Sequence, residues 1–327
     1  MIPIWKFLSA SAAHALAPLG VRFYSDLPSR TSPEWKPFTW KGLSFANRLG
    51  VSGGVDKNAE TLDCWSRLGF GFAEIGTVTP RPQKPNPGKI LDRDWNEKLL
   101  WNKMGFPNAG QYDVRARLQT LGPQAVPVFA NVGKNRDTAP EKAHEDYAEA
   151  ARILSPFVDA IVINVSSPNT QGLRSLQSKE MLGTLVTHTR ENSNGKPVLV
   201  KFSPDESETA LRESLDVAAG HGAEGFILTN TTLSRPPDSN WPETGGLSGR
   251  FLQERSKAAL KVAVRHFQAS SSKPLLVSAG GVLTPADVAE RLDLGADLVQ
   301  VYAALVFEGP SFARQTASYF HEKVRTS

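Results

Sequence analysis

Residues 160–170 read Ala160-Ile161-Val162-Ile163-Asn164-Val165-Ser166-Ser167-Pro168-Asn169-Thr170, an apolar run that passes directly into amides and hydroxyls. The apolar half predicts a buried strand, and the polar half predicts a loop at its carboxyl end. Taken alone, the polar half could be an ordinary turn, because Ser-Pro and Pro-Asn are common loop dipeptides. A polar site is the better explanation, because most of the other predicted strands end in the same way.

Strand, polar loop and helix recur through the rest of the chain. Apolar runs mark eight strand candidates, at residues 48–52, 72–75, 126–131, 160–164, 198–202, 225–229, 275–278 and 298–302. Between them lie segments with helical apolar spacing, and one has a capped start at Thr284-Pro285-Ala286-Asp287 and a stop at Gly295. Buried strands that alternate with helices indicate a parallel sheet covered on both faces. We predict an α/β fold, a (β/α)8 TIM barrel spanning 41–327, with a doubly wound open sheet as the alternative.

The first 40 residues predict a small N-terminal helical extension. Apolar residues at roughly helical spacing are Ile4, Trp5, Leu8, Ala12 and Leu16. Pro18 should end this helix, residues 19–24 should begin a second one, and residues 29–37 should form a linker. Two such helices with exposed aromatic side chains could rest on a membrane surface.

Two alternatives exist for this extension. A plain helix pair could close one end of the domain by packing. A secretory signal is the other alternative, since residues 13–17 resemble a cleavage site, although Lys6 interrupts the apolar region that a signal requires.

Composition narrows the class of protein. The 327 residues are 40% hydrophobic, and 37 Lys and Arg against 33 Asp and Glu give a net charge of +4. No basic stripe with interleaved aromatics is present, so we expect no nucleic-acid partner, whereas anionic substrates or a lipid surface remain compatible. The single cysteine, Cys64, excludes an internal disulfide and is expected to pack in the core. No run of 18 apolar residues predicts a membrane-spanning helix.

In a barrel of this kind the active site is built at the carboxyl ends of the strands. Those ends carry, in order, Gly53-Gly54-Val55-Asp56-Lys57, Thr77, Asn131, Asn164 with Ser167 and Asn169, Lys201, Thr229-Asn230-Thr231, Ser278-Ala279-Gly280-Gly281, and Tyr302. Amides, hydroxyls and two lysines around one rim suit a flat heterocycle with an anionic group. Two long loops, 77–111 and 230–249, should leave the same face.

The Gly280-Gly281 pair follows the seventh strand and precedes the capped helix. Barrels often bind a phosphate there on free backbone N–H groups, so we interpret the pair as a phosphate cradle rather than only a tight turn.

Histidine is absent from the predicted rim. All six histidines, including His14, fall in helix-like segments or in loops on the opposite face. We therefore expect no metal site and no serine–histidine nucleophile. The chief acid at the rim is Asp56, which leaves Ser167 or a lysine as the proton acceptor.

Several motifs resemble one family. They are the 164–170 stretch followed by Gly172-Leu173-Arg174, Asp56-Lys57, Asn102-Lys103-Met104-Gly105-Phe106, Thr229-Asn230-Thr231-Thr232, and Gly245-Gly246-Leu247-Ser248-Gly249-Arg250. Over about residues 41–310 the chain resembles dihydroorotate dehydrogenase of class 2, the quinone-dependent, membrane-associated class. The N-terminal helices agree with that class.

The resemblance implies an FMN enzyme that oxidises (S)-dihydroorotate to orotate and passes the electrons to a quinone in de novo pyrimidine biosynthesis. Ser167 would be the base that takes the proton from C5. Because a serine hydroxyl is a weak base in water, its pocket must be closed and dry, and residues 167–176 would supply part of the closing loop. The resemblance also implies a peripheral protein on the cytoplasmic side of the inner or cell membrane. We expect a monomer.

The same resemblance implies residue roles. Substrate would be bound by Lys57, Asn102, Lys103, Met104, Gly105, Phe106, Asn164, Asn169, Asn230 and Thr231. FMN would be bound by Gly53, Gly54, Val55, Asp56, Lys57, Thr77, Asn131, Asn164, Lys201, Thr229, Gly249, Gly280, Gly281, Tyr302 and Ala303. Quinone access would involve Arg93 and Tyr302, with residues 1–40 as the membrane and quinone-access segment.

The chain departs from the family pattern where Gly53-Gly54-Val55 replaces Ala-Gly-Leu and Ala303 replaces Ser or Thr. Alternative functions are a related FMN barrel acting on another dihydropyrimidine, a dihydroorotate dehydrogenase with a different electron acceptor, and a non-catalytic phosphate-binding barrel. The related pyrimidine enzymes typically place a cysteine on the catalytic loop, and Cys64 lies on a different element.

Overall fold

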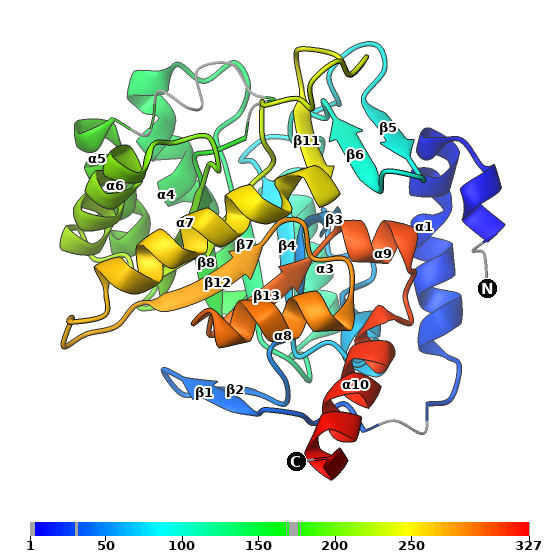
Figure 1. Cartoon of the computed structure of the whole chain (residues 1–327). Helices are drawn as coiled ribbons and strands as arrows, with labels where there is room; N and C mark the ends of the chain where they lie inside the picture. The colour runs from blue at the N-terminus through cyan, green and yellow to red at the C-terminus, as the bar shows by residue number, and fades with distance from the viewer. Residues whose placement is uncertain (1–3, 30–31, 168, 170–175, 177, 327) are drawn as a thin grey trace.

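The computed structural model describes residues 4–29, 32–167, 169, 176 and 178–326, and its centre is a closed parallel barrel (Figure 1). The barrel strands are β3 (Leu49–Asp56), β4 (Phe72–Val78), β7 (Val128–Val132), β8 (Ala160–Asn164), β9 (Val198–Phe202), β10 (Gly225–Leu228), β12 (Leu275–Ala279) and β13 (Leu298–Val301). β13 pairs with β3 and thereby closes the ring, which confirms the predicted TIM barrel and rules out the open sheet.

All eight strand predictions are confirmed, and the largest difference in bounds is at the first. We expected Gly53, Gly54, Val55 and Asp56 to form a loop, but β3 continues through them to Asp56. Paired glycines usually indicate a turn. Here they sit where the register with β4 shifts between Val51 and Asp56, and Gly54 has a φ of +93°.

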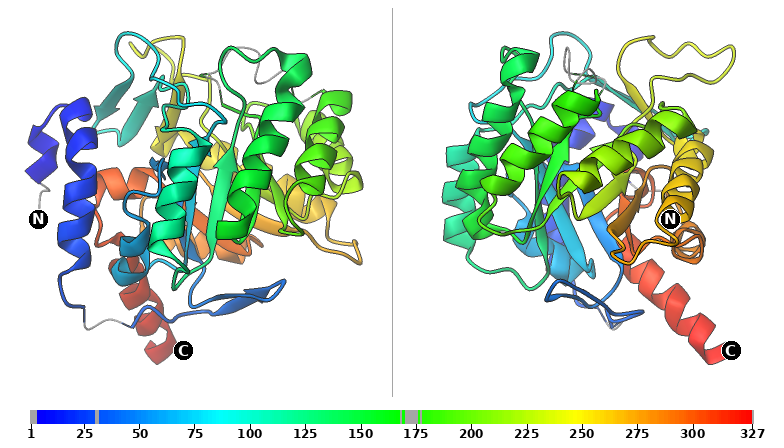
Figure 2. Two further views of the ribbon diagram at one scale, coloured as in Figure 1. Left: turned by 180° about the vertical axis from the view of Figure 1, so that it is seen from behind. Right: turned by 90° about the vertical axis from the view of Figure 1, so that its left-hand side faces the viewer.

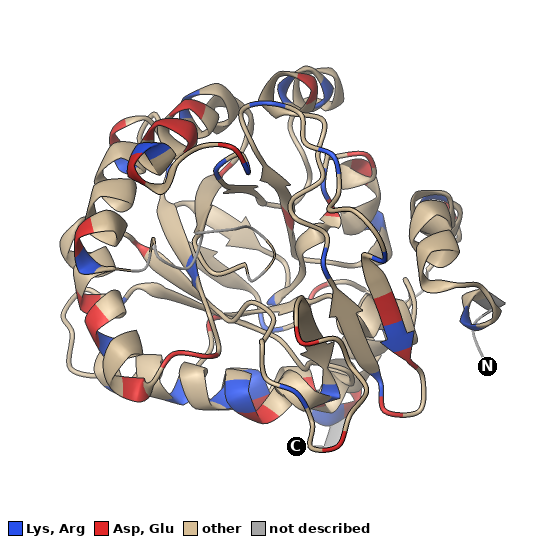
Figure 3. Ribbon diagram, turned by 90° about the horizontal axis from the view of Figure 1, so that it is seen from above, with Lys and Arg blue, Asp and Glu red and all other residues tan. Residues whose placement is uncertain are grey.

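Helices surround the barrel, as the view onto the rim shows (Figure 3). They are α2 (Leu62–Leu68), α3 (Gln111–Leu121), α4 (Ala143–Leu154), α5 (Lys179–Glu191), α6 (Glu208–Gly220), α7 (Gln253–His266), α8 (Pro285–Asp293), α9 (Ala303–Phe307) and α10 (Phe312–Thr326), with short 3-10 turns η2 (Pro140–Lys142), η3 (Ser155–Phe157) and η5 (Arg250–Leu252). The predicted capping box of α8 is present, because Thr284 Oγ1 accepts from Asp287 N and Asp287 Oδ2 accepts from Thr284 N. Cys64 is fully buried in α2, as expected.

A hairpin of β1 (Phe38–Trp40) and β2 (Leu43–Phe45) closes the end of the barrel opposite the rim (Figures 1 and 2). Phe45 enters the barrel, and its ring centroid lies 5.8 Å from that of Phe72 and 6.4 Å from that of Phe129. These rings begin an apolar core that fills the lower barrel. Toward the carboxyl ends of the strands polar side chains follow this core, with Glu74 two residues after Phe72 on β4 and Lys201 two residues after Leu199 on β9.

Both long loops contribute to a small antiparallel sheet above the rim. β5 (Leu91–Asp94) and β6 (Leu99–Asn102) come from the first loop and β11 (Gly246–Gly249) from the second, in the order β11-β6-β5. The two loops therefore leave the same face, as predicted, and together wall one side of the space above the strands.

The N-terminal extension consists of η1 (Ile4–Phe7) and one long helix, α1 (Ala10–Ser25), beside the barrel (Figure 2). The prediction that Pro18 ends a helix is wrong, because Pro18 lies inside α1. The break falls earlier, where the Ser9 side chain accepts from Ala12 N and caps α1. A proline has a φ compatible with a helix and removes one hydrogen bond, a loss that packing of α1 against α2 and β5 can offset. In the described part of the chain, no helix is long and apolar enough to cross a membrane.

Phe45→Ala should lower the free energy of unfolding by about 3 kcal/mol, since it leaves a cavity between rings that close the barrel. Chemical denaturation measures this, with Tyr112→Ala, whose ring is largely exposed, as the control. Equal stability of Phe45→Ala and the control would show that the hairpin is not part of the barrel core.

Candidate active site

A cavity of about 1210 Å³ extends from the barrel rim to the inner face of α1. It is lined by residues from every barrel strand end, from β5 and β6, and from α1 and α9. The lining includes all predicted site residues except Asp56 and Lys103. The rim positions inferred from scattered strand ends therefore come together at one site.

The floor of the cavity is an ion pair within the barrel. Lys201 Nζ lies 3.1 Å from Glu74 Oε1 and 3.3 Å from Oε2, and Glu74 is completely buried. Gln300 Nε2 donates to Glu74 Oε2 at 2.6 Å, and Ser52 Oγ lies 3.4 Å from Lys201 Nζ. Two charges can remain in a dry interior only when they pair and their hydrogen bonds are satisfied, as they are here.

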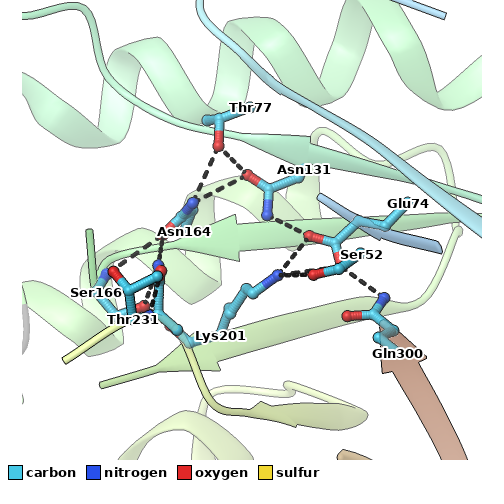
Figure 4. A network of polar contacts seen from close by, with 10 residues as sticks. Ser52, Glu74, Thr77, Asn131, Asn164, Ser166, Lys201, Thr231 and Gln300 are labelled. Atoms are coloured by element: carbon cyan, nitrogen blue, oxygen red, sulfur yellow. Dashed lines mark hydrogen bonds and ion pairs between the residues drawn. The ribbon is translucent and has the colours of Figure 1, made fainter. Parts of the chain in front are cut away.

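A chain of amides and hydroxyls rises from this pair (Figure 4). Asn131 Nδ2 donates to Glu74 Oε1 at 2.5 Å, while its Oδ1 accepts from Thr77 Oγ1 at 2.6 Å and from Asn164 Nδ2 at 3.2 Å. Asn230 Nδ2 then donates to Asn164 Oδ1 at 3.2 Å. Each amide is oriented by its neighbour, so the orientation of the rim is set from the ion pair outward.

Ser167 lies on the same rim, buried, immediately after β8. Its Oγ accepts from Asn169 N at 3.3 Å, and Asn169 Nδ2 donates to Asn102 Oδ1 of β6 at 2.8 Å. The remaining amide oxygen, Asn169 Oδ1, is buried and has no hydrogen-bond partner among the described residues. Most of the predicted closing loop, residues 168, 170–175 and 177, lies outside the described residues.

One histidine reaches the site, contrary to our prediction that all six lie away from the rim. His14 lines the cavity from α1, and its Nε2 lies 3.1 Å from Lys57 Nζ. Burial lowers the pKa of Lys57 to about 8, and burial together with the Lys57 charge lowers the pKa of His14 to about 4. Near neutral pH a neutral His14 therefore accepts a hydrogen bond from the Lys57 ammonium. His14 was set aside because it falls in a helix-like segment, and the sequence does not show that α1 lies against Lys57.

Two predicted site residues do not line the cavity. The Asp56 carboxylate accepts from Glu60 N, Thr61 N and Thr61 Oγ1, so it holds the start of α2. Burial raises the pKa of Asp56, and these hydrogen bonds oppose the shift. Lys103 contributes its backbone N–H to Ile90 O.

Glycines that follow β11 and β12 line another part of the rim. Gly249, Gly280 and Gly281 have φ values of +87°, +102° and +73° and lie beside Tyr302 and Ala303 at the start of α9. Among the described residues, the N–H groups of Gly280 and Gly281 donate to no protein acceptor. We call the 280–281 segment the glycine loop. Backbone N–H groups without a protein acceptor, such as those of this loop, are suited to an anion.

The remaining predicted group, Arg93 of β5, joins the extension to the rim sheet. Its Nη2 donates to Trp5 O and Leu8 O, both at 2.7 Å, and its guanidinium lies over the Trp95 ring. Arg93 and Tyr302 both line the cavity.

Sequence reasoning missed Glu74, Gln300 and His14. A usable signal existed for the first two, because each interrupts an otherwise apolar barrel strand, as Lys201 does. Charged and amide residues in fully buried strands must find one another inside the barrel. No comparable signal marked His14, which needed the position of α1.

Known proteins resemble this chain over nearly its whole length. The family model of dihydroorotate dehydrogenase matches residues 38–323. A dihydroorotate dehydrogenase (quinone) of Thermus thermophilus is 48% identical, covering 84% of this chain and 79% of the relative, and one from a second strain of that species is 44% identical, covering 94% and 91%. The crystal structure of DHODH from Eimeria tenella in complex with ferulenol superposes with a TM-score of 0.88 at 31% identity, covering 98% of this chain and 93% of that one.

The barrel and its polar rim define an oxidoreductase of the flavin-binding (β/α)8 class. Within that class, the chain belongs to the dihydroorotate dehydrogenase family, which confirms the resemblance found in its motifs.

Glu74→Gln should lower the unfolding free energy of the cofactor-free protein by about 3 kcal/mol, because it leaves the Lys201 ammonium buried without its counter-ion. The double variant Glu74→Gln/Lys201→Gln should recover part of the loss in a double-mutant cycle. Glu254→Gln, in an exposed ion pair, is the control. A coupling of zero would contradict the pairing.

Proposed function

We propose a role for each part of the cavity in the reaction of this chain, the FMN-dependent oxidation of (S)-dihydroorotate to orotate with a quinone as electron acceptor in pyrimidine biosynthesis. The observation that carries the proposal is the single cavity in which the oriented amides, Ser167, Lys57 and the glycine loop all meet. The amides suit the flat rings of FMN and dihydroorotate, Lys57 suits the carboxylate of dihydroorotate, and the glycine loop suits the phosphate of FMN.

The donors present fit FMN. Lys201, Thr77, Asn131 and Thr229 line the rim beside the ring, and the buried Gln300 Oε1 has no hydrogen-bond partner among the described residues. On the opposite side the N–H groups of the glycine loop are available for the phosphate, with Ala303 and Tyr302 adjacent. When bound, FMN supplies the hydride acceptor of the reaction. Lys201 would hold positive charge against the ring, and Glu74 below keeps that charge in place.

Ser167 is the proposed acceptor of the C5 proton of dihydroorotate. It is buried at the cavity wall, and the backbone of Asn169 holds its Oγ in a fixed direction. A hydroxyl accepts a carbon-bound proton only when water is excluded and the proton can move on, so its effect depends on a closed site.

Dihydroorotate itself would be held by paired amides and one cation. Asn102 and Asn169 form one pair, and Asn164 and Asn230 form the other. Asn169 Oδ1, which is buried and has no partner in the described part of the chain, would accept from an N–H of the pyrimidine ring. Lys57, held by His14, would bind the carboxylate. Met104, Gly105, Phe106 and Thr231 complete the lining around the ring.

Ser167→Ala should still bind orotate but should lose at least about 100-fold in the rate of flavin reduction by dihydroorotate, since general-base catalysis is removed. Anaerobic stopped-flow absorbance measures the rate. Ser203→Ala, which removes a buried hydroxyl outside the cavity, should react normally. Reduction of Ser167→Ala at nearly the wild-type rate from pH 6 to 9 would refute the role.

Orotate affinity should fall as pH rises through about 8, by up to about tenfold per pH unit, because the Lys57 ammonium that binds the carboxylate deprotonates there. His14 stays neutral over this range and does not contribute. Spectrophotometric titration should show weak and pH-independent binding for Lys57→Gln, with Lys261→Gln, on the exposed face of α7, as the control outside the cavity. A flat profile in the wild type would contradict the assignment.

We also propose that residues 1–40 form the membrane and quinone-access segment and residues 41–327 the FMN-binding barrel. In support, Phe7, Leu19 and Phe23 are 79%, 66% and 65% exposed on η1 and α1, and the cavity reaches the inner side of α1. In Figure 3 these helices carry few charges, unlike the ring helices. An exposed apolar face beside such an opening suits a monomer bound peripherally to the cytoplasmic side of the inner or cell membrane. Arg93 and Tyr302 would then line the quinone path.

Phe7→Ser/Phe23→Ser should lower activity with a long-chain quinone in vesicles by at least about tenfold, because apolar area for membrane binding is lost. Activity with a soluble dye should stay unchanged, and vesicle co-sedimentation should fall in parallel. Tyr112→Ser/Leu233→Ser removes exposed apolar groups elsewhere and is the control. Equal losses with both acceptors would argue against the membrane role.

A further inference from the structure

Arg291 of α8 is a completely buried cation directly behind the glycine loop. Its four hydrogen bonds all go to neutral oxygens: Nη1 to Ser278 Oγ at 3.2 Å, and Nη2 to Gln253 O at 3.1 Å, Ser256 Oγ at 2.9 Å and Gly280 O at 3.0 Å. Among the described residues, Arg291 has no ion pair within 4.0 Å.

Three nearby carboxylates, those of Asp287, Glu290 and Glu254, act on Arg291 through their charge, but each makes its hydrogen bonds or ion pairs with other groups. Asp287 accepts from Gln253 Nε2 at 2.9 Å and caps α8, while Glu290 and Glu254 both pair with Lys257. Burial lowers the pKa of Arg291 to about 10, so the guanidinium remains charged near neutral pH. A buried charge of this kind is costly unless an anion lies within its field.

The hydrogen bond to Gly280 O fixes the direction of the next N–H group. In a trans peptide the C=O of Gly280 and the N–H of Gly281 point in opposite directions. Ser256 Oγ donates to the same oxygen at 2.7 Å, so two donors hold it toward the interior. The Gly281 N–H is thereby directed away from the interior, and Gly281 lines the cavity.

Arg291 also holds this loop against the start of α7. A Cβ on Gly281 would lie 2.4 Å from Gln253 Cα, so the two backbones are in close contact. Since Nη2 binds both Gln253 O and Gly280 O, the same guanidinium ties the first residue of α7 to the loop.

We propose that Arg291 is a positioning residue for the phosphate of FMN: without touching the phosphate, it directs the Gly281 N–H into the cavity and places a positive charge behind the loop. The inference rests on the proposed function, in which this loop binds the phosphate. The bound dianion would then add negative charge on the cavity side of Arg291, where the described residues make no ion pair with it.

The test compares FMN with riboflavin, which carries the same ring without the phosphate. Binding of each to cofactor-free protein is measured by flavin fluorescence quenching for the wild type, Arg291→Met, Arg291→Lys and Ser256→Ala. Arg291→Met should bind FMN about tenfold or more weakly, which is the effect of losing one charged hydrogen-bond donor, while riboflavin changes by less than about twofold. The preference for FMN over riboflavin should be partly kept in Arg291→Lys. It should be reduced in Ser256→Ala, although that variant retains the charge of Arg291. Arg265→Met, on the exposed face of α7, is the control.

The outcomes separate the two levels of the proposal. A wild type that binds FMN and riboflavin equally would overturn the phosphate loop itself. A wild type that prefers FMN, together with an Arg291→Met variant that keeps the full preference or loses both ligands equally, would overturn only the role of Arg291. If Arg291→Met does not fold, an unchanged FMN preference in both Arg291→Lys and Ser256→Ala would do the same.

Discussion

The ion pair between Glu74 and Lys201 is the constraint on which the rest of the site depends. A carboxylate and an ammonium inside a barrel whose lower half is filled by apolar rings cannot be solvated, so every lone pair and proton must be used by neighbours. Asn131, Gln300 and Lys201 satisfy the carboxylate, which fixes side chains on three further strands relative to β4. Because the buried charges must be paired and hydrogen-bonded, they fix the positions of the side chains at the rim.

From the ion pair, hydrogen bonds run toward the rim, and each one fixes the orientation of the next amide side chain. Asn131 orients Asn164, and Asn164 orients Asn230, so the groups proposed to contact substrate are set before any ligand arrives. The groups at the margins are held differently. His14 of α1 fixes Lys57, and Arg291 of α8 fixes the glycine loop. Removal of α1 would therefore alter the polar site as well as the apolar surface.

The fold and most of the rim could be predicted from the sequence, because strand ends in a parallel barrel converge whatever the details of the loops. Gly280-Gly281 and the 164–169 stretch were found in this way. Glu74 was passed over because it lies within a strand rather than at its end, and His14 because only the tertiary position of α1 brings it to Lys57. The prediction that Pro18 ends a helix was wrong because packing of α1 against α2 and β5 outweighs the low helix propensity of proline. The sequence likewise could not show that Asp56 serves the start of α2.

The most direct test of this account is the visible absorption band of the FMN-loaded wild-type enzyme under anaerobic conditions. We predict that dihydroorotate bleaches the band within a single turnover at each site and that a quinone then restores it. A band that dihydroorotate leaves unchanged, in protein shown to contain stoichiometric FMN, would contradict the assignment of this cavity as the site where the pyrimidine is oxidised.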